Sequence, residues 1–176
     1  MAAHDDEKVK IEAAKIIDLF HTLPRLVVFD LDYTLWPFYC EFYDEDDIPS
    51  LYPHATGILY ALKDRGIELA IASRSPASNV AKTFLSKLGI DSLFVVQEIF
   101  SSWTDKTEHF QRIHTRTGVP FHSMLFFDDE YRNIEAVSKM GVTCVWVDRG
   151  VTLEALREGL AKFSQKSRSH GMIGRN

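Results

Sequence analysis

The sequence predicts an α/β fold in which a doubly wound, five-stranded parallel sheet carries helices on both faces. Five short, continuous apolar runs are rich in β-branched and aromatic residues, as is typical of strands buried on both faces. Segments with helical spacing of apolar residues alternate with these runs, and glycine follows four of the segments. Alternation of strand and helix is the pattern of a parallel sheet whose strands are joined by crossover helices.

The composition is that of one globular domain. The chain has 176 residues, and its 45% hydrophobic and 26% charged residues exclude disorder of the whole chain. A net charge of −5 gives no electrostatic basis for binding the phosphate backbone of nucleic acid. No apolar run approaches the roughly 18–20 residues that span a bilayer. Cys40 and Cys144 are expected to be reduced thiols. The first residues (MAAHDDE) are acidic and resemble no targeting segment, so we expect a cytoplasmic protein. We also expect a monomer that binds neither nucleic acid nor membrane.

The N-terminal segment, residues 5–21, is predicted to be a helix that Leu23 and Pro24 bring to an end. Its apolar residues at helical spacing are Val9, Ala13, Ile16, Ile17 and Phe20. We expect this N-terminal part (residues 1–23) to pack on the domain that follows (residues 24–163). The polar, glycine-containing residues 164–176 are expected to form a mobile tail.

The remaining elements follow in order. Residues 25–29 (RLVVF) predict the first strand, and a helix at residues 54–65 leads to the second strand at residues 67–72 (IELAIA). The next helix, residues 76–88, has Ser75 as its expected N-cap, with Pro76 at its first position. The later strands are predicted at residues 93–96, 124–127 and 142–147, and the later helices at residues 106–117, 130–140 and 153–163, with Thr152 as the cap of the last helix.

A polar stretch, residues 41–50, lies between the first strand and the helix at residues 54–65. Its acidic residues are Glu41, Asp44, Glu45, Asp46 and Asp47. Consecutive acids on a flexible connection are common on protein surfaces. We therefore interpret the stretch as a solvated loop, with a metal site as the alternative.

Charged and hydroxyl residues gather where the predicted strands end, which is where ligands bind in open parallel sheets. The first strand is followed by Asp30, Asp32 and Thr34, the second by Ser73 and Arg74, and the fourth by Asp128 and Asp129, while Lys106 begins a helix. A single acid pair could cap a helix. Two pairs on one edge, however, repel each other unless a cation joins them. Since all the candidate ligands are oxygens, the predicted cation is Mg²⁺.

These residues resemble the four motifs of the haloacid dehalogenase (HAD) superfamily. FDLDYTL resembles motif one, DxDx[TV], while Ser73, Lys106 and FFDDE resemble motifs two, three and four in the family order. The longer strings FDLDYTLWPF, ASRS and KTEHFQRI are similar to one branch, the magnesium-dependent phosphatase-1 family. The resemblance runs from residue 26 to residue 147. It implies a Rossmann-like, HAD-like domain that hydrolyses phosphomonoesters with Mg²⁺.

The resemblance also implies a role for each matching residue. Asp30 is the nucleophile that forms an aspartyl-phosphate, and Asp32 is the general acid and then the general base. The metal is held by Asp30, by Asp32 through its backbone carbonyl, and by Asp128 and Asp129, either of which is the direct ligand with the other bound through water. The phosphate is contacted by Leu31, Thr34, Ser73 and Lys106, with Thr34 also holding the turn. An exposed lysine at the start of a helix is the alternative for Lys106, but the helix dipole disfavours it.

Other residues near the motifs are candidates for contacting substrate. Arg74 can clamp a phosphate or carboxylate bidentately, and a surface ion pair is the alternative. Trp36 and Tyr39 are expected to line the mouth of the site, with Phe38 there or in the core. Asn133 is expected to bond the loop after the first strand. The histidines show no metal spacing and are expected on the surface or on helix faces; they are His54, His109, His114 and His122.

The short connections leave no room for a separate cap domain over the site. The resemblance then implies an open site for phosphotyrosine-like, sugar or glycated-amine phosphates, on a small molecule or a phosphoprotein side chain. A dehalogenase is disfavoured because a leaving halide needs no general acid such as Asp32. Two alternatives remain, a catalytically inactive HAD-type binding module and a receiver-like phospho-acceptor domain.

Overall fold

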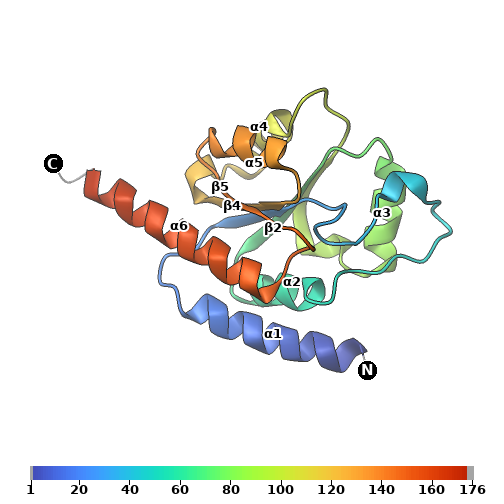
Figure 1. Cartoon of the computed structure of the whole chain (residues 1–176), viewed down its shortest axis with the longest axis horizontal. Helices are drawn as coiled ribbons and strands as arrows, with labels where there is room; N and C mark the ends of the chain where they lie inside the picture. The colour runs from blue at the N-terminus through green and yellow to red at the C-terminus, as the bar shows by residue number, and fades with distance from the viewer. Residues whose placement is uncertain (1, 174–176) are drawn as a thin grey trace.

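A parallel, five-stranded sheet forms the centre of the molecule. The computed structural model describes residues 2–173. The strands are β1 (Leu26–Phe29), β2 (Glu68–Ser73), β3 (Phe94–Ile99), β4 (Met124–Asp128) and β5 (Thr143–Trp146), in the order β3-β2-β1-β4-β5 (Figure 1). The predicted doubly wound α/β fold is therefore confirmed.

Helices cover both faces of the sheet (Figure 1). They are α1 (Ala2–Asp18), α2 (Ala55–Asp64), α3 (Ser78–Lys87), α4 (Thr107–Thr117), α5 (Tyr131–Ser138) and α6 (Leu153–Ile173). Short 3₁₀ turns lie at Cys40–Phe42, Asp91–Leu93 and Phe121–Ser123. One apolar core joins the sheet to α1, α2, α3 and α6, and a smaller one joins its other face to α4 and α5. Successive residues of β1 point to opposite faces of the sheet. Val27 and Phe29 therefore pack in the larger core, and Leu26 and Val28 pack in the smaller one.

The strand order places a topological switch between β1 and β4. The chain runs outward from β1 to β2 and β3, then returns to form β4 on the other side of β1. The register pairs Phe29 of β1 with both Ile71 of β2 and Phe127 of β4. The carboxyl ends of these three strands therefore lie level with one another, which is where a ligand site is expected in such a sheet.

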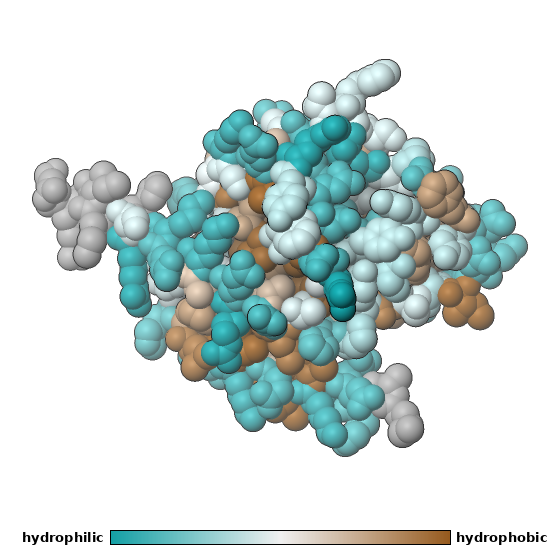
Figure 2. All heavy atoms as spheres, in the orientation of Figure 1, coloured by the Kyte–Doolittle hydropathy of each residue, from teal (hydrophilic) through white to brown (hydrophobic). Residues whose placement is uncertain are grey.

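The N-terminal helix packs outside α2 and α6. Its residues Ala13, Ile16 and Ile17 are buried in the larger core. Gly57 of α2 allows this approach, because a Cβ at that position would lie 2.6 Å from the Val9 side chain. Figure 2 shows that the viewed face is mainly hydrophilic, with apolar residues between α6 and α1, which are in contact.

Several helix boundaries differ from the prediction: α1 spans Ala2–Asp18 rather than residues 5–21, and α5 ends at Ser138 rather than at residue 140. Helix α3 begins at Ser78, because Ala77 is not helical, and the Ser75 hydroxyl accepts a hydrogen bond from the Ala77 amide instead of capping the helix. Helix α6 continues past Phe163 to Ile173, since no proline or glycine interrupts residues 164–170. The predicted Thr152 cap is confirmed by its bond to the Ala155 amide, at 3.1 Å. Residues 174–176 of the predicted tail lie outside the described residues. The division at residues 23 and 163 stays a prediction.

The acidic stretch at residues 41–50 is a loop whose acids are exposed, as predicted. It lies against α3, where the Thr83 hydroxyl donates to Glu45 and the Lys87 ammonium donates to the Asp47 carbonyl. Within residues 2–173 these acids form no group that could hold a metal ion, so the alternative metal site is not observed. None of the described helices is long and apolar enough to cross a membrane.

Candidate active site

A polar cleft of about 230 Å³ lies over the carboxyl ends of β1, β2 and β4. Most of the predicted site residues line it; these are Asp30, Asp32, Tyr39, Ser73, Arg74, Lys106 and Asp129. Asp30 directly follows β1, while Ser73 and Asp128 are the last residues of β2 and β4. The fold thus brings the predicted motifs together at the switch point.

Lys106 links two of the carboxylates. Its ammonium donates to Asp30 Oδ1 at 2.7 Å and to Asp128 Oδ2 at 2.6 Å, and the residue is only 1% exposed. Burial disfavours the charged ammonium, but the Asp128 and Asp30 carboxylates outweigh burial and raise the pKa of Lys106. The alternative of an exposed lysine is therefore wrong.

The turn after β1 holds Asp30 from behind. Thr34 is fully buried and its hydroxyl donates to Asp30 Oδ2 at 3.0 Å. Leu31 is also fully buried, with its side chain in the larger core. The side chains of Thr34 and Leu31 therefore lie away from the cleft, and only the backbone of this turn remains available for the predicted phosphate contact.

Asp32 is held by a neighbouring tryptophan. Its Oδ1 accepts hydrogen bonds from Trp36 Nε1 at 2.7 Å and from the Cys40 amide at 3.1 Å. Tyr33 has a φ of 57°, an uncommon value for a non-glycine residue, and it makes the tight turn that sets these partners together. Trp36 is fully buried and stacks on Phe38, so the prediction that it lines the mouth is wrong.

Three carboxylates form the candidate metal centre. Oxygens of Asp30, Asp128 and Asp129 all lie within 4.8 Å of one another. Burial and then the charge of Asp30 raise the pKa of Asp128, and the same causes raise the pKa of Asp129 to about 9. A cation would relieve this repulsion, and an all-oxygen donor set fits Mg²⁺. The carboxylate of Asp32 is outside this group. That the backbone carbonyl of Asp32 binds the metal stays a prediction.

Asn133 has a different partner from the one expected. Its Nδ2 donates to Asp128 Oδ2 at 3.1 Å rather than to the loop after β1, because α5 starts directly behind Asp128. Asp128 Oδ1 also accepts from the Glu130 amide at 2.9 Å. Both oxygens of Asp128 are thus oriented by their neighbours.

Ser73 and Arg74 form the opposite wall of the cleft. Ser73 is 1% exposed. Arg74 donates from Nε and Nη2 to the side chain and backbone of Ser102, at 3.1 and 2.8 Å, and its Nη1 lies 3.8 Å from Glu130. Its guanidinium is therefore held at the rim of the cleft. The ion pair that was the alternative for Arg74 is also present, as the long contact with Glu130. Tyr39 is 44% exposed at the same rim, with its ring edge-on to Tyr33.

Sequence reasoning missed two residues near the site. His109 is predicted on the surface or on a helix face; it lies on a helix face, but on the buried face of α4, and its Nε2 is 2.8 Å from the Ser73 carbonyl oxygen. The spacing of Lys106, His109, Phe110 and Ile113 is that of one buried helix face, which was a usable signal. Trp146 at the end of β5 donates to the Asp129 carbonyl at 2.8 Å, and no sequence pattern marks that bond.

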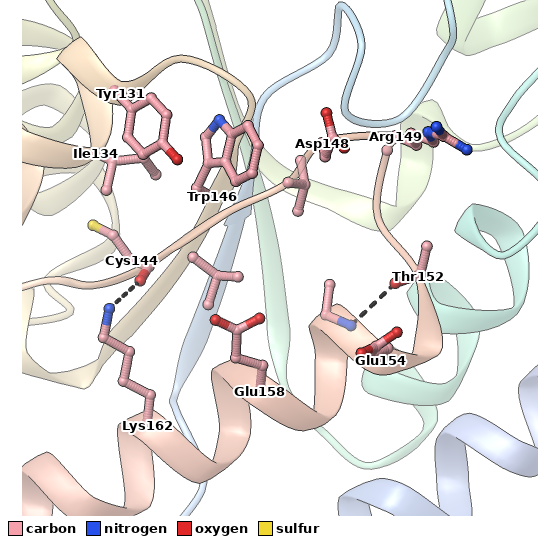
Figure 3. A pocket seen from close by; sticks show the side chains of 14 residues that line it. Tyr131, Ile134, Cys144, Trp146, Asp148, Arg149, Thr152, Glu154, Glu158 and Lys162 are labelled. Atoms are coloured by element: carbon pink, nitrogen blue, oxygen red, sulfur yellow. Dashed lines mark hydrogen bonds between the residues drawn. The ribbon is translucent and has the colours of Figure 1, made fainter.

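A larger hollow of about 560 Å³ lies elsewhere, along β5 between α5 and α6 (Figure 3). Its lining includes the stacked Tyr131 and Trp146 rings and the Glu158 and Lys162 side chains of α6. Lys162 donates to the Cys144 carbonyl at 2.7 Å and so covers part of the free edge of β5 (Figure 3). None of the predicted site residues lines this hollow, so the larger cavity volume does not mark the candidate active site.

Comparisons with known proteins agree with this geometry. The acid phosphatase family matches residues 22–166. Magnesium-dependent phosphatase 1 of Homo sapiens is 39% identical over 158 residues, which cover 81% of this chain and 89% of the human protein. A HAD-like hydrolase superfamily protein of Schizosaccharomyces pombe is 38% identical over 68% of this chain and 83% of its own length. A HAD-superfamily hydrolase from Ehrlichia chaffeensis shares the fold, with a TM-score of 0.66 at 13% identity over 81% of this chain and 98% of that one.

Proposed function

The chain belongs to the acid phosphatase family of the HAD superfamily, and we propose that it is a Mg²⁺-dependent phosphomonoesterase that works through an aspartyl-phosphate on Asp30. The observation that carries the proposal is the convergence of Asp30, Asp128 and Asp129 in one cleft, with the buried Lys106 bonded to the first two. Attack of a carboxylate on a phosphoryl group needs nearby positive charge, because both groups are negatively charged.

Mg²⁺ would be held by Asp30, Asp128 and Asp129. When bound, it offsets the negative charge of these acids and of the phosphoryl oxygens. Lys106 adds a second positive charge from the protein itself. Ser73 donates its hydroxyl hydrogen to a phosphoryl oxygen, and Arg74 binds an acidic group of the substrate at the rim.

Asp30 and Asp32 divide the chemistry between them. An Asp30 oxygen attacks phosphorus as the bond to the leaving oxygen breaks, and Asp32 gives that oxygen its proton. Both hydrogen bonds that the described residues make to Asp32 fall on Oδ1, so we assign the proton transfer to Oδ2. Asp32, now a carboxylate, then takes a proton from the water that attacks phosphorus. This second attack releases phosphate and restores Asp30.

The cleft is open, because no cap domain covers it in the described fold. An open cleft fits a phosphate on a small molecule or on a protein side chain, and we propose phosphotyrosine-like, sugar and glycated-amine phosphates as substrates. The test is phosphate release from an aryl phosphate, a sugar phosphate, a glycated-amine phosphate and a phosphotyrosine peptide, each with Mg²⁺. The proposal is contradicted if the folded protein releases phosphate from none of these four substrates.

Neither the inactive binding module nor the receiver-like domain gains support from the site or from the relatives.

Tyr39 is expected to select substrates more than to act in the chemistry. Its exposed ring lies at the rim, where it can contact the apolar part of a leaving group. Such binding is shared by the ground state and the transition state, so its loss raises KM with little change in kcat. We expect Tyr39→Ala to raise KM about threefold to tenfold for an aryl phosphate and less for a small sugar phosphate.

Steady-state kinetics on both substrates check this, with Tyr60→Ala on α2 as a control for the loss of a tyrosine away from the cleft. A fall in kcat with unchanged KM on both substrates would place Tyr39 in the catalytic scaffold instead.

A further inference from the structure

His109 is a buried histidine on α4, three residues after Lys106. Its exposed fraction is 0%, and its ring stacks on Phe100 at 3.7 Å between centroids, with the two planes 4° apart. The guanidinium of Arg112 lies 4.2 Å from the centre of the Phe100 ring. Phe100 is therefore in contact with both charged and aromatic side chains of α4, and His109 is fixed in one orientation.

One nitrogen of the ring makes both of its hydrogen bonds. Nε2 lies 2.8 Å from the Ser73 carbonyl oxygen and 2.9 Å from the Phe100 carbonyl oxygen. A carbonyl oxygen can only accept, so Nε2 carries the hydrogen and donates to both. Burial lowers the pKa of His109 to about 4, although the two carbonyls oppose that shift, and the ring is neutral with a single N–H at neutral pH.

The other ring nitrogen, Nδ1, is buried and has no hydrogen-bond partner within the described part of the chain. Burial of a polar atom without a partner costs stability. A phenylalanine would fill similar space, stack on Phe100 and avoid that cost. Of the two ring nitrogens that a phenyl ring lacks, only Nε2 has partners among the described residues, so the N–H at Nε2 is the group that the histidine contributes.

The two carbonyls belong to segments that carry site residues. Ser73 is the last residue of β2, and its hydroxyl is proposed above to contact the phosphate. Phe100 opens the loop to α4, in which Ser102 anchors Arg74 and which ends at Lys106. Because His109 is itself on α4, its two bonds join α4, the end of β2 and the start of this loop at one point.

We propose that His109 is a positioning residue that sets Ser73 and Lys106 in their catalytic places relative to Asp30. This inference rests on the proposed function. It predicts that replacing the imidazole by a planar aromatic ring that has no N–H lowers kcat through Ser73. In His109→Phe we expect kcat to fall about tenfold or more, since a displacement of about 1 Å at a reacting centre can cost on the order of 100-fold.

The chain supplies a matched control on the same helix. His114 is half-buried near the other end of α4, its Nδ1 is 2.7 Å from the Val119 carbonyl oxygen, and its ring contacts Phe121. His114→Phe also removes an imidazole–carbonyl bond, and we expect it to leave kcat unchanged. His109→Gln keeps an N–H donor, so it is expected to recover part of the activity lost in His109→Phe. If His109→Phe does not fold, the kcat of His109→Gln is compared with that of the wild type instead.

A double-mutant cycle separates positioning from a general loss of stability. The kcat of His109→Phe, Ser73→Ala and the double variant is measured below their thermal unfolding midpoints. If His109 acts through Ser73, its substitution lowers kcat much less in the Ser73→Ala background than in the wild type.

Additive losses of kcat in the double variant, or equal losses of kcat in His114→Phe and His109→Phe, overturn the inference. An impaired Ser73→Ala with a fully active His109→Phe also overturns it and leaves the proposed function intact. A fully active Ser73→Ala contradicts the phosphate contact proposed for Ser73, and with it this inference.

Discussion

Asp30→Asn is expected to lower kcat by about 1,000-fold or more, a loss of at least about 4 kcal/mol of transition-state stabilisation. The amide has the shape of the carboxylate but cannot attack phosphorus, so the first step of the proposed reaction has no nucleophile. The variant should still fold, because Lys106 keeps Asp128 as a partner and Thr34 can still bond the amide oxygen. The measurement is steady-state hydrolysis of an aryl phosphate, with thermal unfolding to confirm the folded state.

Asp64→Asn is a suitable control for Asp30→Asn. Asp64 lies on α2, pairs with Lys10 at 2.9 Å and is away from the cleft, so its substitution removes one negative charge without touching the site. We expect wild-type kinetics in this control. More than a few per cent of wild-type activity in Asp30→Asn would contradict the assignment of Asp30 as nucleophile.

Removal of Mg²⁺ is expected to abolish activity as completely as the loss of Asp30. Without a cation, three carboxylates face one another within 4.8 Å, and the phosphate would add further negative charge to the cleft. Activity measured after EDTA treatment should fall to the background rate, and added Mg²⁺ should restore it.

Ca²⁺ is expected not to restore activity in that experiment. Its ligands lie at about 2.3–2.6 Å and number 6–8, whereas Mg²⁺ holds a compact octahedron at about 2.0–2.1 Å. The larger ion would therefore misplace Asp30 relative to phosphorus. Full activity in metal-free buffer would show that Lys106 alone neutralises the acids, against the interpretation of the cleft as a metal centre.

Most of the fold could be predicted from the sequence, because it depends on local patterns. Each strand contains a short apolar run and each helix has a buried face of regular spacing. The carboxyl ends of parallel strands share one edge, so the order of the strands along the chain is enough to place Asp30, Ser73 and Asp128 together. Lys106 at a helix start follows from the same reasoning.

The rest of the site depends on contacts that spacing does not determine. Trp36 looks like a rim residue from its place after Asp32, but the left-handed backbone of Tyr33 turns the chain back and buries the indole against Phe84. His109 is polar in type, which favours a surface position, although the neighbouring carbonyls of two other segments satisfy its N–H in the interior. Such partners are set by tertiary packing and leave no pattern along the chain.

The central claim, an aspartyl-phosphate on Asp30, can be tested directly in Asp32→Asn. An aryl phosphate has a good leaving group, so the first step needs little help from Asp32, whereas the attack of water in the second step needs its base. The phosphoenzyme should therefore accumulate. Rapid quenching followed by borohydride converts an acyl phosphate to an alcohol, and mass spectrometry of the peptides locates it. We predict homoserine at position 30. Release of the phenol with Asp30 unmodified would contradict the account.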